Sequence, residues 1–196
     1  MEEEFDADTD GFEDEIADLV EEELDEPVQL GEDDDFDEAD GKRKLGHRKY
    51  FYIRNKRNGK YLEVAAGRCH NGNNIHLWHF TGSKAQQFYW HKHNGKSYLV
   101  NAGCHKVVDI ARGNCATGAN LHLWTYHGRS NQVFKRYGDI LYNPTCQTAI
   151  DNSYNRSYNG NNIQSYWYNP YTPAQQWSIE HMWYQRDDNS TPLAIQ

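Results

Sequence analysis

The sequence lacks the features that mark several large classes of protein. It has no apolar run approaching the roughly 18 to 20 residues that a membrane-spanning helix needs. It opens on Met-Glu-Glu-Glu, without the basic stretch and apolar core of a signal peptide. It contains no glycine-rich phosphate-binding loop, no HExxH, no GxSxG and no CxxC. These absences argue against membrane-spanning, nucleotide-binding, zinc-protease, hydrolase and thioredoxin functions.

Positive charge is absent from the first part of the chain. Residues 1–41 hold 22 of the 29 acidic residues and no Lys or Arg. Like charges at this density repel one another and the apolar residues are scattered, so we expect residues 1–43 to be a largely disordered acidic tail. One alternative stays open: between Asp14 and Pro27, the apolar residues would share one face of an amphipathic helix that docks on the basic half of the chain.

The composition then changes to Tyr, Trp, Asn, Gly and His. Short runs of β-forming residues, such as Tyr50–Ile53 and Lys106–Ile110, alternate with Asn-Gly turn signals, as at Asn94. No segment there shows a sustained helical period. We therefore predict an all-β domain over residues 44–185, followed by a short C-terminal tail at residues 186–196.

An internal repeat organises this domain. An acid is followed at +13, +15, +22, +23 and +25 by matching residues in the first two copies, and a one-residue insertion shifts the last three positions in the third. The three copies read Glu63, His76, Trp78, Ala85, Gln86 and Phe88; Asp109, His122, Trp124, Asn131, Gln132 and Phe134; Asp151, Gln164, Tyr166, Ala174, Gln175 and Trp177. We predict three repeats, at about 48–91, 92–138 and 139–183, that share one core about a pseudo-threefold axis.

The repeated acid, closed by Gln-x-aromatic, resembles the ricin B-chain, or R-type (QxW), lectin family. The resemblance covers about residues 48–183, although Phe88 and Phe134 stand where the family usually has Trp. It implies a β-trefoil fold and a non-enzymatic lectin without a cofactor. It also implies galactose or N-acetylgalactosamine as the ligand, presented by glycans or glycoproteins.

The middle repeat has the full set of residues that such a sugar requires. The Asp109 carboxylate can accept hydroxyl hydrogen bonds, the Asn131 amide can donate and accept, and the Trp124 ring can cover the C–H face of a pyranose. His122, where the family often has Gln, supports the acid or the sugar, or else is a satisfied turn residue. Gln132 and its counterparts most simply satisfy buried backbone groups beside an aromatic core residue.

The other two repeats keep only part of this set. The retained residues are Asp151, Gln164 and Tyr166 in the third repeat, and His76 and Trp78 in the first. In the third repeat Ala174 stands at the amide position, which removes a hydrogen bond of about 1 kcal/mol, so we expect a weaker site. In the first, Glu63 and Ala85 replace both the aspartate and the amide, and a non-binding scaffold repeat is the alternative there.

Catalysis and metal binding have little support in the sequence. Glycoside hydrolysis needs two carboxyl groups roughly 5 to 9.5 Å apart, whereas Glu63, Asp109 and Asp151 belong to repeats that a threefold axis would hold apart. Paired histidines, such as His76 with His79, have no Cys or acid beside them at zinc-site spacing. We expect a protein that binds its ligand without reaction and holds no metal.

The four cysteines allow three connectivities. Cys69 and Cys115 each lie six residues after the repeat acid, and Cys104 and Cys146 each lie five before it. Symmetry favours Cys69–Cys104 and Cys115–Cys146, because pairing Cys104 with Cys115 would leave the other two in non-equivalent places. Disulfides indicate an oxidising compartment and a secreted protein; a cytoplasmic location is the alternative if no leader exists.

The charge of the two parts suggests a competing function. Residues 42–196 carry all 20 basic residues and the remaining 7 acidic ones, a net charge of +13. A heparin- or sulfated-glycan-binding trefoil is therefore the alternative to a galactose-type lectin, while no nucleic-acid motif is present. Lys42–Arg43 follows the acidic tail directly, which favours either a propeptide cleaved after Arg43 or a permanent solubilising tail. The oligomeric state stays open.

Overall fold

The computed structural model describes residues 49–113 and 115–182, and this part of the chain contains twelve β-strands and six short 3-10 segments. The strands are β1 (Phe51–Asn55), β2 (Tyr61–Val64), β3 (Ile75–Trp78), β4 (Phe88–His93), β5 (Lys96–Asn101), β6 (Lys106–Ile110), β7 (Ala119–Trp124), β8 (Lys135–Tyr137), β9 (Ile140–Asn143), β10 (Thr148–Asn152), β11 (Ile163–Trp167) and β12 (Trp177–His181). The all-β prediction is confirmed. The predicted acidic tail, the dibasic Lys42–Arg43 pair and the C-terminal tail lie outside the described residues.

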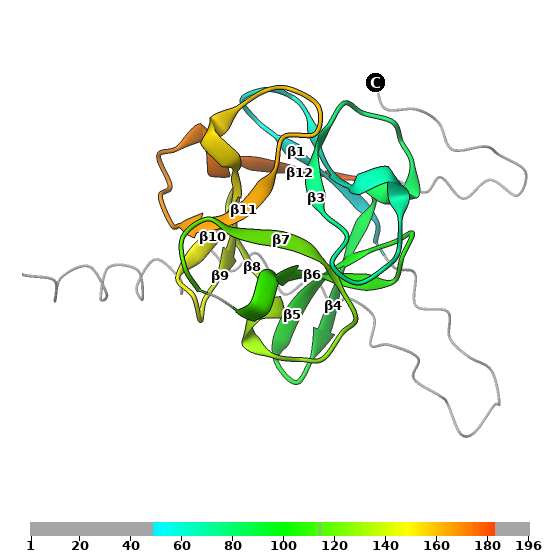
Figure 1. Ribbon diagram of the computed structural model, residues 1–196, viewed down its shortest axis with the longest axis vertical. Coiled ribbons are helices and arrows are strands. Elements are labelled where there is room, and N and C mark those ends of the chain that lie inside the picture. The colour runs from blue at the N-terminus through cyan, green and yellow to red at the C-terminus, as the bar shows by residue number, and fades with distance from the viewer. Residues whose placement is uncertain (1–48, 114, 183–196) are drawn as a thin grey trace, which may run out of the picture.

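Three units of four consecutive strands surround a common axis (Figure 1). In each unit the second and third strands form an antiparallel hairpin: β2 with β3, β6 with β7 and β10 with β11. The first and fourth strands of the units also pair, β1 with β12 and β4, β4 with β5, and β8 with β9. This arrangement confirms the predicted β-trefoil of three pseudo-symmetric repeats.

One hydrophobic core serves all three units. Phe88, Phe134 and Trp177, the aromatic residues of the Gln-x-aromatic signature, are at most 1% exposed and belong to the same buried cluster. Burying such a side chain contributes about 1.5 to 3 kcal/mol. The Trp177 indole also donates to the carbonyl of Ile150 over 2.9 Å, so the polar edge of the largest ring is satisfied.

Asparagines line the pseudo-threefold axis. Asn74, Asn120 and Asn162 occupy the same position in the three repeats, eleven residues after the acid. Asn120 donates to Asn74 and Asn74 donates to Asn162, each over 3.0 Å. Asn120 lies on β7, while Asn74 and Asn162 directly precede β3 and β11, the other two strands near the centre of Figure 1.

A second set of asparagines joins consecutive repeats. Asn55, Asn101 and Asn143 each precede the repeat acid by eight residues and are fully buried. The Asn101 side chain donates to the carbonyls of Lys84 and Ala85, and its oxygen accepts from the backbone of Cys104. One side chain thereby ties the 3-10 segment of the first repeat to the β5–β6 turn of the second.

The disulfides match the predicted pairs. Cys69 is bonded to Cys104 and Cys115 to Cys146, with Cα atoms 5.1 and 4.9 Å apart. Each bond joins a loop after one repeat acid to the turn before the next acid. The symmetry prediction is therefore confirmed, and both junctions between described consecutive repeats are covalently fixed.

Candidate functional site

The acid of each repeat faces the residue found thirteen positions later. Asp109 on β6 lies directly opposite His122 on β7, and Glu63–His76 and Asp151–Gln164 pair in the same register. Side chains directly opposite each other on a hairpin have Cβ atoms about 4.5 to 5.5 Å apart. The +13 spacing of the sequence is thus a cross-strand contact between the acid and a hydrogen-bond donor.

The repeated glutamine clamps the loop after the hairpin onto the acid. Gln132 donates to Asp109 Oδ2 over 2.9 Å and to the carbonyl of Thr125 over 3.1 Å, while its oxygen accepts from the backbone of His127. Gln86 and Gln175 make the same three kinds of contact in their repeats. All three glutamines are fully buried, and each holds the acid of its own repeat in place.

In the middle repeat the carboxylate is surrounded by donors. His122 Nε2 lies 3.0 Å from Asp109 Oδ1, while Asn131 donates to Oδ2 over 2.9 Å. Gln132 contacts Oδ2 as well, and His127 Nε2 lies 3.4 Å from it. The structure therefore brings the predicted polar residues together, but they are already bonded to one another.

Trp124 completes the middle repeat. Its ring is 37% exposed and stacks on the His122 imidazole, with centroids 5.2 Å apart and an angle of 24° between the planes. A Cβ placed on Gly72 would lie 3.8 Å from this ring, so a loop of the first repeat borders the indole. The indole is exposed, as stacking on a sugar requires, whereas Asp109 itself is only 3% exposed.

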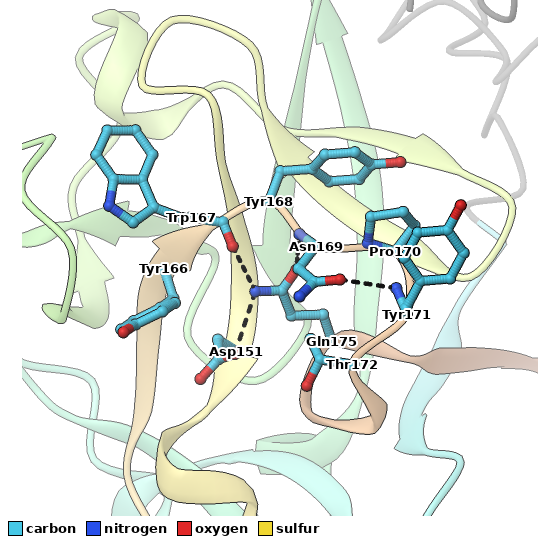
Figure 2. Close-up of a pocket in the computed structure, with 9 residues that line it drawn as sticks. All are labelled: Asp151, Tyr166, Trp167, Tyr168, Asn169, Pro170, Tyr171, Thr172 and Gln175. Atoms are coloured by element: carbon cyan, nitrogen blue, oxygen red, sulfur yellow. Dashed lines mark hydrogen bonds between the residues drawn. The ribbon is translucent and has the colours of Figure 1, made fainter. Parts of the chain in front are cut away.

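In the third repeat the acid faces a pocket of about 400 Å³ (Figure 2). The pocket is lined by Asp151, Tyr166, Trp167, Tyr168, Asn169, Pro170, Tyr171, Thr172 and Gln175. Figure 2 shows Gln175 reaching from Asp151 to the backbone of Trp167, with Tyr166 on one side and Tyr171 on the other. Tyr166, Trp167 and Tyr171 are exposed, at 42, 56 and 91%.

Two features of the third repeat leave this space open. The loop between Tyr166 and Gln175 has one residue more than the corresponding loops, and Ala174 stands where Asn131 contacts the acid in the middle repeat. Within the described chain Asp151 accepts only from Gln164, over 2.9 Å, and Gln175, over 3.2 Å. Burial raises the pKa of Asp151, and the two amide hydrogen bonds offset part of this shift.

The first repeat has the same arrangement, with a glutamate in place of the aspartate. His76 Nε2 lies 3.3 Å from Glu63 Oε1, and Gln86 donates to Oε2 over 2.8 Å. Trp78 stacks on His76 with centroids 5.1 Å apart, and its ring borders Gly160. Ala85 stands at the amide position of this repeat, and the acid is a glutamate, one methylene longer than its two aspartate counterparts.

The described residues form neither a metal-binding group nor a membrane-spanning helix. No group of three or more His, Cys, Asp or Glu side chains there is arranged to hold a metal ion. The paired histidines have other neighbours instead, as His91 and His93 both lie edge-on to Tyr126. In the same part of the chain we find no helix with the length and apolar character for a membrane crossing.

Comparison with known proteins identifies chains that share this fold. Residues 42–124 match the family described as ricin-type β-trefoil lectin domain-like. This match covers less than half of the chain, and the fold of the described residues is a β-trefoil. The designed threefold symmetric protein ThreeFoil is 25% identical, with a TM-score of 0.63, and the match covers 67% of this chain and 97% of that one. Among curated proteins, none matches the chain.

Two natural trefoils are also similar. The match to the exo-β-1,3-galactanase 1,3Gal43A from Clostridium thermocellum has 26% identity and a TM-score of 0.61, and covers 67% of this chain but only 30% of the galactanase. The C-half of an earthworm R-type lectin, solved in complex with GalNAc, is 16% identical with a TM-score of 0.58, over 68% of this chain and 98% of that one. The trefoil thus occurs in lectins and as one part of larger glycosidases.

Some residues of the site lie outside the positions that the repeat analysis singled out. His127 contacts Asp109 from eighteen positions along the chain, and its counterparts Thr81 and Asn169 share no chemistry with it. Trp167 ends β11, and Tyr171 lies in the following loop, which carries the insertion. The sequence signals nothing at these positions, because their residue types do not recur between repeats.

Proposed function

We propose that this protein is a non-enzymatic lectin that binds galactose or N-acetylgalactosamine on glycans. The observation that carries the proposal is the Asp151 carboxylate, held by Gln164 and Gln175 at a pocket walled by exposed aromatic rings. A carboxylate has about four lone-pair sites, so two remain for sugar hydroxyls. Tyr166 or Trp167 offers an apolar face for the C–H side of a pyranose.

The third-repeat pocket is the stronger of the two sites in this proposal, and the Asp109 site of the middle repeat is the second. The sequence favoured the opposite order because it counted the amide of Asn131 as a sugar ligand. Asn131 instead donates to Asp109 Oδ2 and to the carbonyl of Ile110. Because the middle repeat has all of the expected residues, Asp109 is less able to accept a hydrogen bond from a ligand.

Binding without catalysis agrees with how the three acids are held. Each lies in a different repeat and is bonded to the glutamine and cross-strand residue of that repeat. A glycosidase instead pairs two carboxyl groups across one scissile bond. The two disulfides further support a proposal that the protein works in an oxidising, extracellular compartment.

Calorimetric titration with N-acetylgalactosamine and galactose-terminated oligosaccharides tests the proposed function. A hydrogen bond to a charged group is worth about 1.5 to 3 kcal/mol, so Asp151→Ala should weaken binding by roughly 10-fold or more. Asp139→Ala removes an acid outside the repeat positions and serves as the control. Unchanged affinity in both Asp151→Ala and Asp109→Ala, with the fold intact, would exclude this function.

A sulfated-glycan-binding function is the second candidate, because the surface of the trefoil is cationic. The acids of the described chain are Glu63, Asp109, Asp139, Asp151 and Glu180. The three repeat acids among them are buried. Asp139 pairs with Lys56, and Glu180 lies 3.8 Å from Arg54. Polyanion binding should weaken steeply as salt is added, whereas galactoside binding should change little.

A further inference from the structure

One residue of the loop after each hairpin is held by the repeat glutamine. Thr81, His127 and Asn169 occupy this position, eighteen residues after the acid. The backbone N–H of each donates to the side-chain oxygen of the repeat glutamine, over 2.8, 2.9 and 2.9 Å. The three repeats therefore present different side chains from one fixed backbone position.

In the middle repeat this side chain reaches the acid. His127 Nε2 lies 3.4 Å from Asp109 Oδ2, and no such contact joins Thr81 to Glu63 or Asn169 to Asp151 within the described residues. The backbone N–H of Arg129 donates to His127 Nδ1 over 3.3 Å. Because Nδ1 accepts there, the ring proton of a neutral His127 is on Nε2, the nitrogen that lies near the carboxylate.

This contact crowds one oxygen of Asp109. Oδ1 faces His122, whereas Oδ2 faces Asn131, Gln132 and His127. Each carboxylate oxygen has about two lone-pair sites, so Oδ2 has more neighbours than it can accept from, while Oδ1 keeps one site. A sugar that places hydroxyls on both oxygens must therefore displace a neighbour of Oδ2.

His127 is the donor that can leave. Asn131 and Gln132 are buried, and His122 is held between the acid and the Trp124 ring. The His127 side chain is 31% exposed and lies on a surface loop next to Gly128, whose φ of 73° marks a tight turn. If the imidazole moves into water, it loses only its weak contacts with Asp109 and with the N–H of Arg129. No core packing is disturbed.

We propose that His127 gates the middle-repeat site by occupying on Asp109 the position that a ligand hydroxyl would take. The gate rests on the proposed function, since it presupposes that Asp109 binds the sugar. It makes the middle repeat the weaker site, with an internal competitor that the third repeat lacks. His127 is a specificity-determining residue in this scheme and not a residue that contacts the bound sugar.

The test removes the gate in a protein whose third site has been silenced by Asp151→Ala. His127→Asn and His127→Thr introduce the residues that the other two repeats carry. Both should bind N-acetylgalactosamine roughly 5-fold more tightly than the Asp151→Ala parent, the value of about one net hydrogen bond. His105→Asn, a change at an exposed histidine in the β5–β6 turn, should leave the affinity unchanged.

The outcomes separate the gate from the function on which it rests. If Asp109→Ala in the same background abolishes binding but His127→Asn leaves it unchanged, the site stands and the gate is wrong. If His127→Asn weakens binding, His127 is a sugar ligand and the gate is again wrong. If Asp109→Ala has no effect, the middle repeat binds no sugar and both proposals for it fail.

A spectroscopic measurement gives an independent readout. Two-bond ¹H–¹⁵N correlation spectra of the imidazoles in the Asp151→Ala protein should show His127 as the Nε2-protonated tautomer without ligand. Saturating sugar should shift the His127 signals to those of a solvated ring, while His122 keeps its contact with Asp109. A His127 signal that does not move at saturation contradicts displacement.

Discussion

The Asn58 side chain donates to the carbonyl of Arg156 over 3.3 Å, at the one junction between repeats that has no disulfide. Asn58 lies five residues before Glu63, as Cys104 and Cys146 do before their acids, and Ser157 lies six residues after Asp151, as Cys69 and Cys115 do. The first and last repeats are therefore joined by hydrogen bonds, including one from Arg57 to Asn155, where the other junctions are covalent.

This symmetry predicts that Asn58→Cys/Ser157→Cys forms a third disulfide. The two native bonds span Cα distances of 5.1 and 4.9 Å, and the equivalent position should allow a similar distance. A loop of about 100 residues would be closed, with a stabilisation of up to about 4.7 kcal/mol from the unfolded chain. Thermal unfolding of the oxidised double variant should occur at a higher temperature than that of Asn58→Cys alone. Failure of the thiols to pair would show that the third junction is not equivalent.

Removing a native disulfide should be strongly destabilising. Cys115→Ser/Cys146→Ser opens a loop with a sequence separation of 31, and Cys69→Ser/Cys104→Ser one with a separation of 35. Chain entropy gives about 3 to 4 kcal/mol for each, so the two double variants should lose nearly equal free energy of unfolding. Denaturant titration measures both. A loss confined to one pair would indicate that strain or local packing, rather than loop closure, sets the value.

The third-repeat site should be sensitive to acid. The raised pKa of Asp151 means that the folded protein takes up its proton at a higher pH than an ordinary aspartate, whose pKa is about 3.9. Its carboxylate is the form that accepts from a sugar, so affinity should fall as the pH decreases through the raised pKa. The folded protein itself gains stability from this group as the pH falls through the same window.

Calorimetry of the Asp109→Ala protein over a pH series isolates this effect, because the middle site has been removed. The midpoint for loss of binding should lie above 3.9, with circular dichroism unchanged. An affinity that stays constant to that pH would mean that Asp151 does not accept a hydrogen bond from the ligand.

The acidic tail should compete with anionic ligands. Residues 1–41 carry 22 acidic and no basic residues, while residues 42–196 have a net charge of +13. Tethering gives the tail a high local concentration at the trefoil. Deleting residues 1–43 should therefore increase affinity for heparin at low salt and leave it nearly unchanged at high salt. Equal heparin affinity at low salt, with and without the tail, would show that it does not cover the surface.

Cleavage of the tail is a separate prediction. If Lys42–Arg43 is a processing site, N-terminal sequencing of the protein from its natural source will give Lys44 or Leu45 as the first residue. A mature protein that starts near Met1 would instead support a permanent solubilising tail.

The sequence predicted the fold and the disulfides because both follow from recurrence. The acid, the Gln-x-aromatic signature and the cysteines return at fixed intervals, and each interval corresponds to a contact within or between repeats. Asn101 and its two counterparts recur as regularly, eight residues before the acid. Their recurrence would have predicted the buried side-chain contacts between repeats. Residues that recur between repeats therefore predict the scaffold.

The order of the sites that we propose could not be predicted in the same way. The proposed order rests on the residues around each acid, which include loop residues such as His127 and Tyr171 that differ in every repeat. Asn131 shows the limit most clearly. Its residue type suggested a sugar ligand, and in the structure its amide N–H groups donate to Asp109 and to the carbonyl of Ile110.

Chemical-shift mapping with N-acetylgalactosamine tests the central proposal most directly. Binding at the third-repeat pocket predicts that the side-chain amides of Gln164 and Gln175 and the Trp167 indole shift together and saturate at one affinity. Smaller shifts at the Trp124 indole should appear at higher sugar concentration. Shifts confined to surface Lys and Arg residues, or saturation at Trp124 before Trp167, would contradict a galactose-type lectin whose main site is the Asp151 pocket.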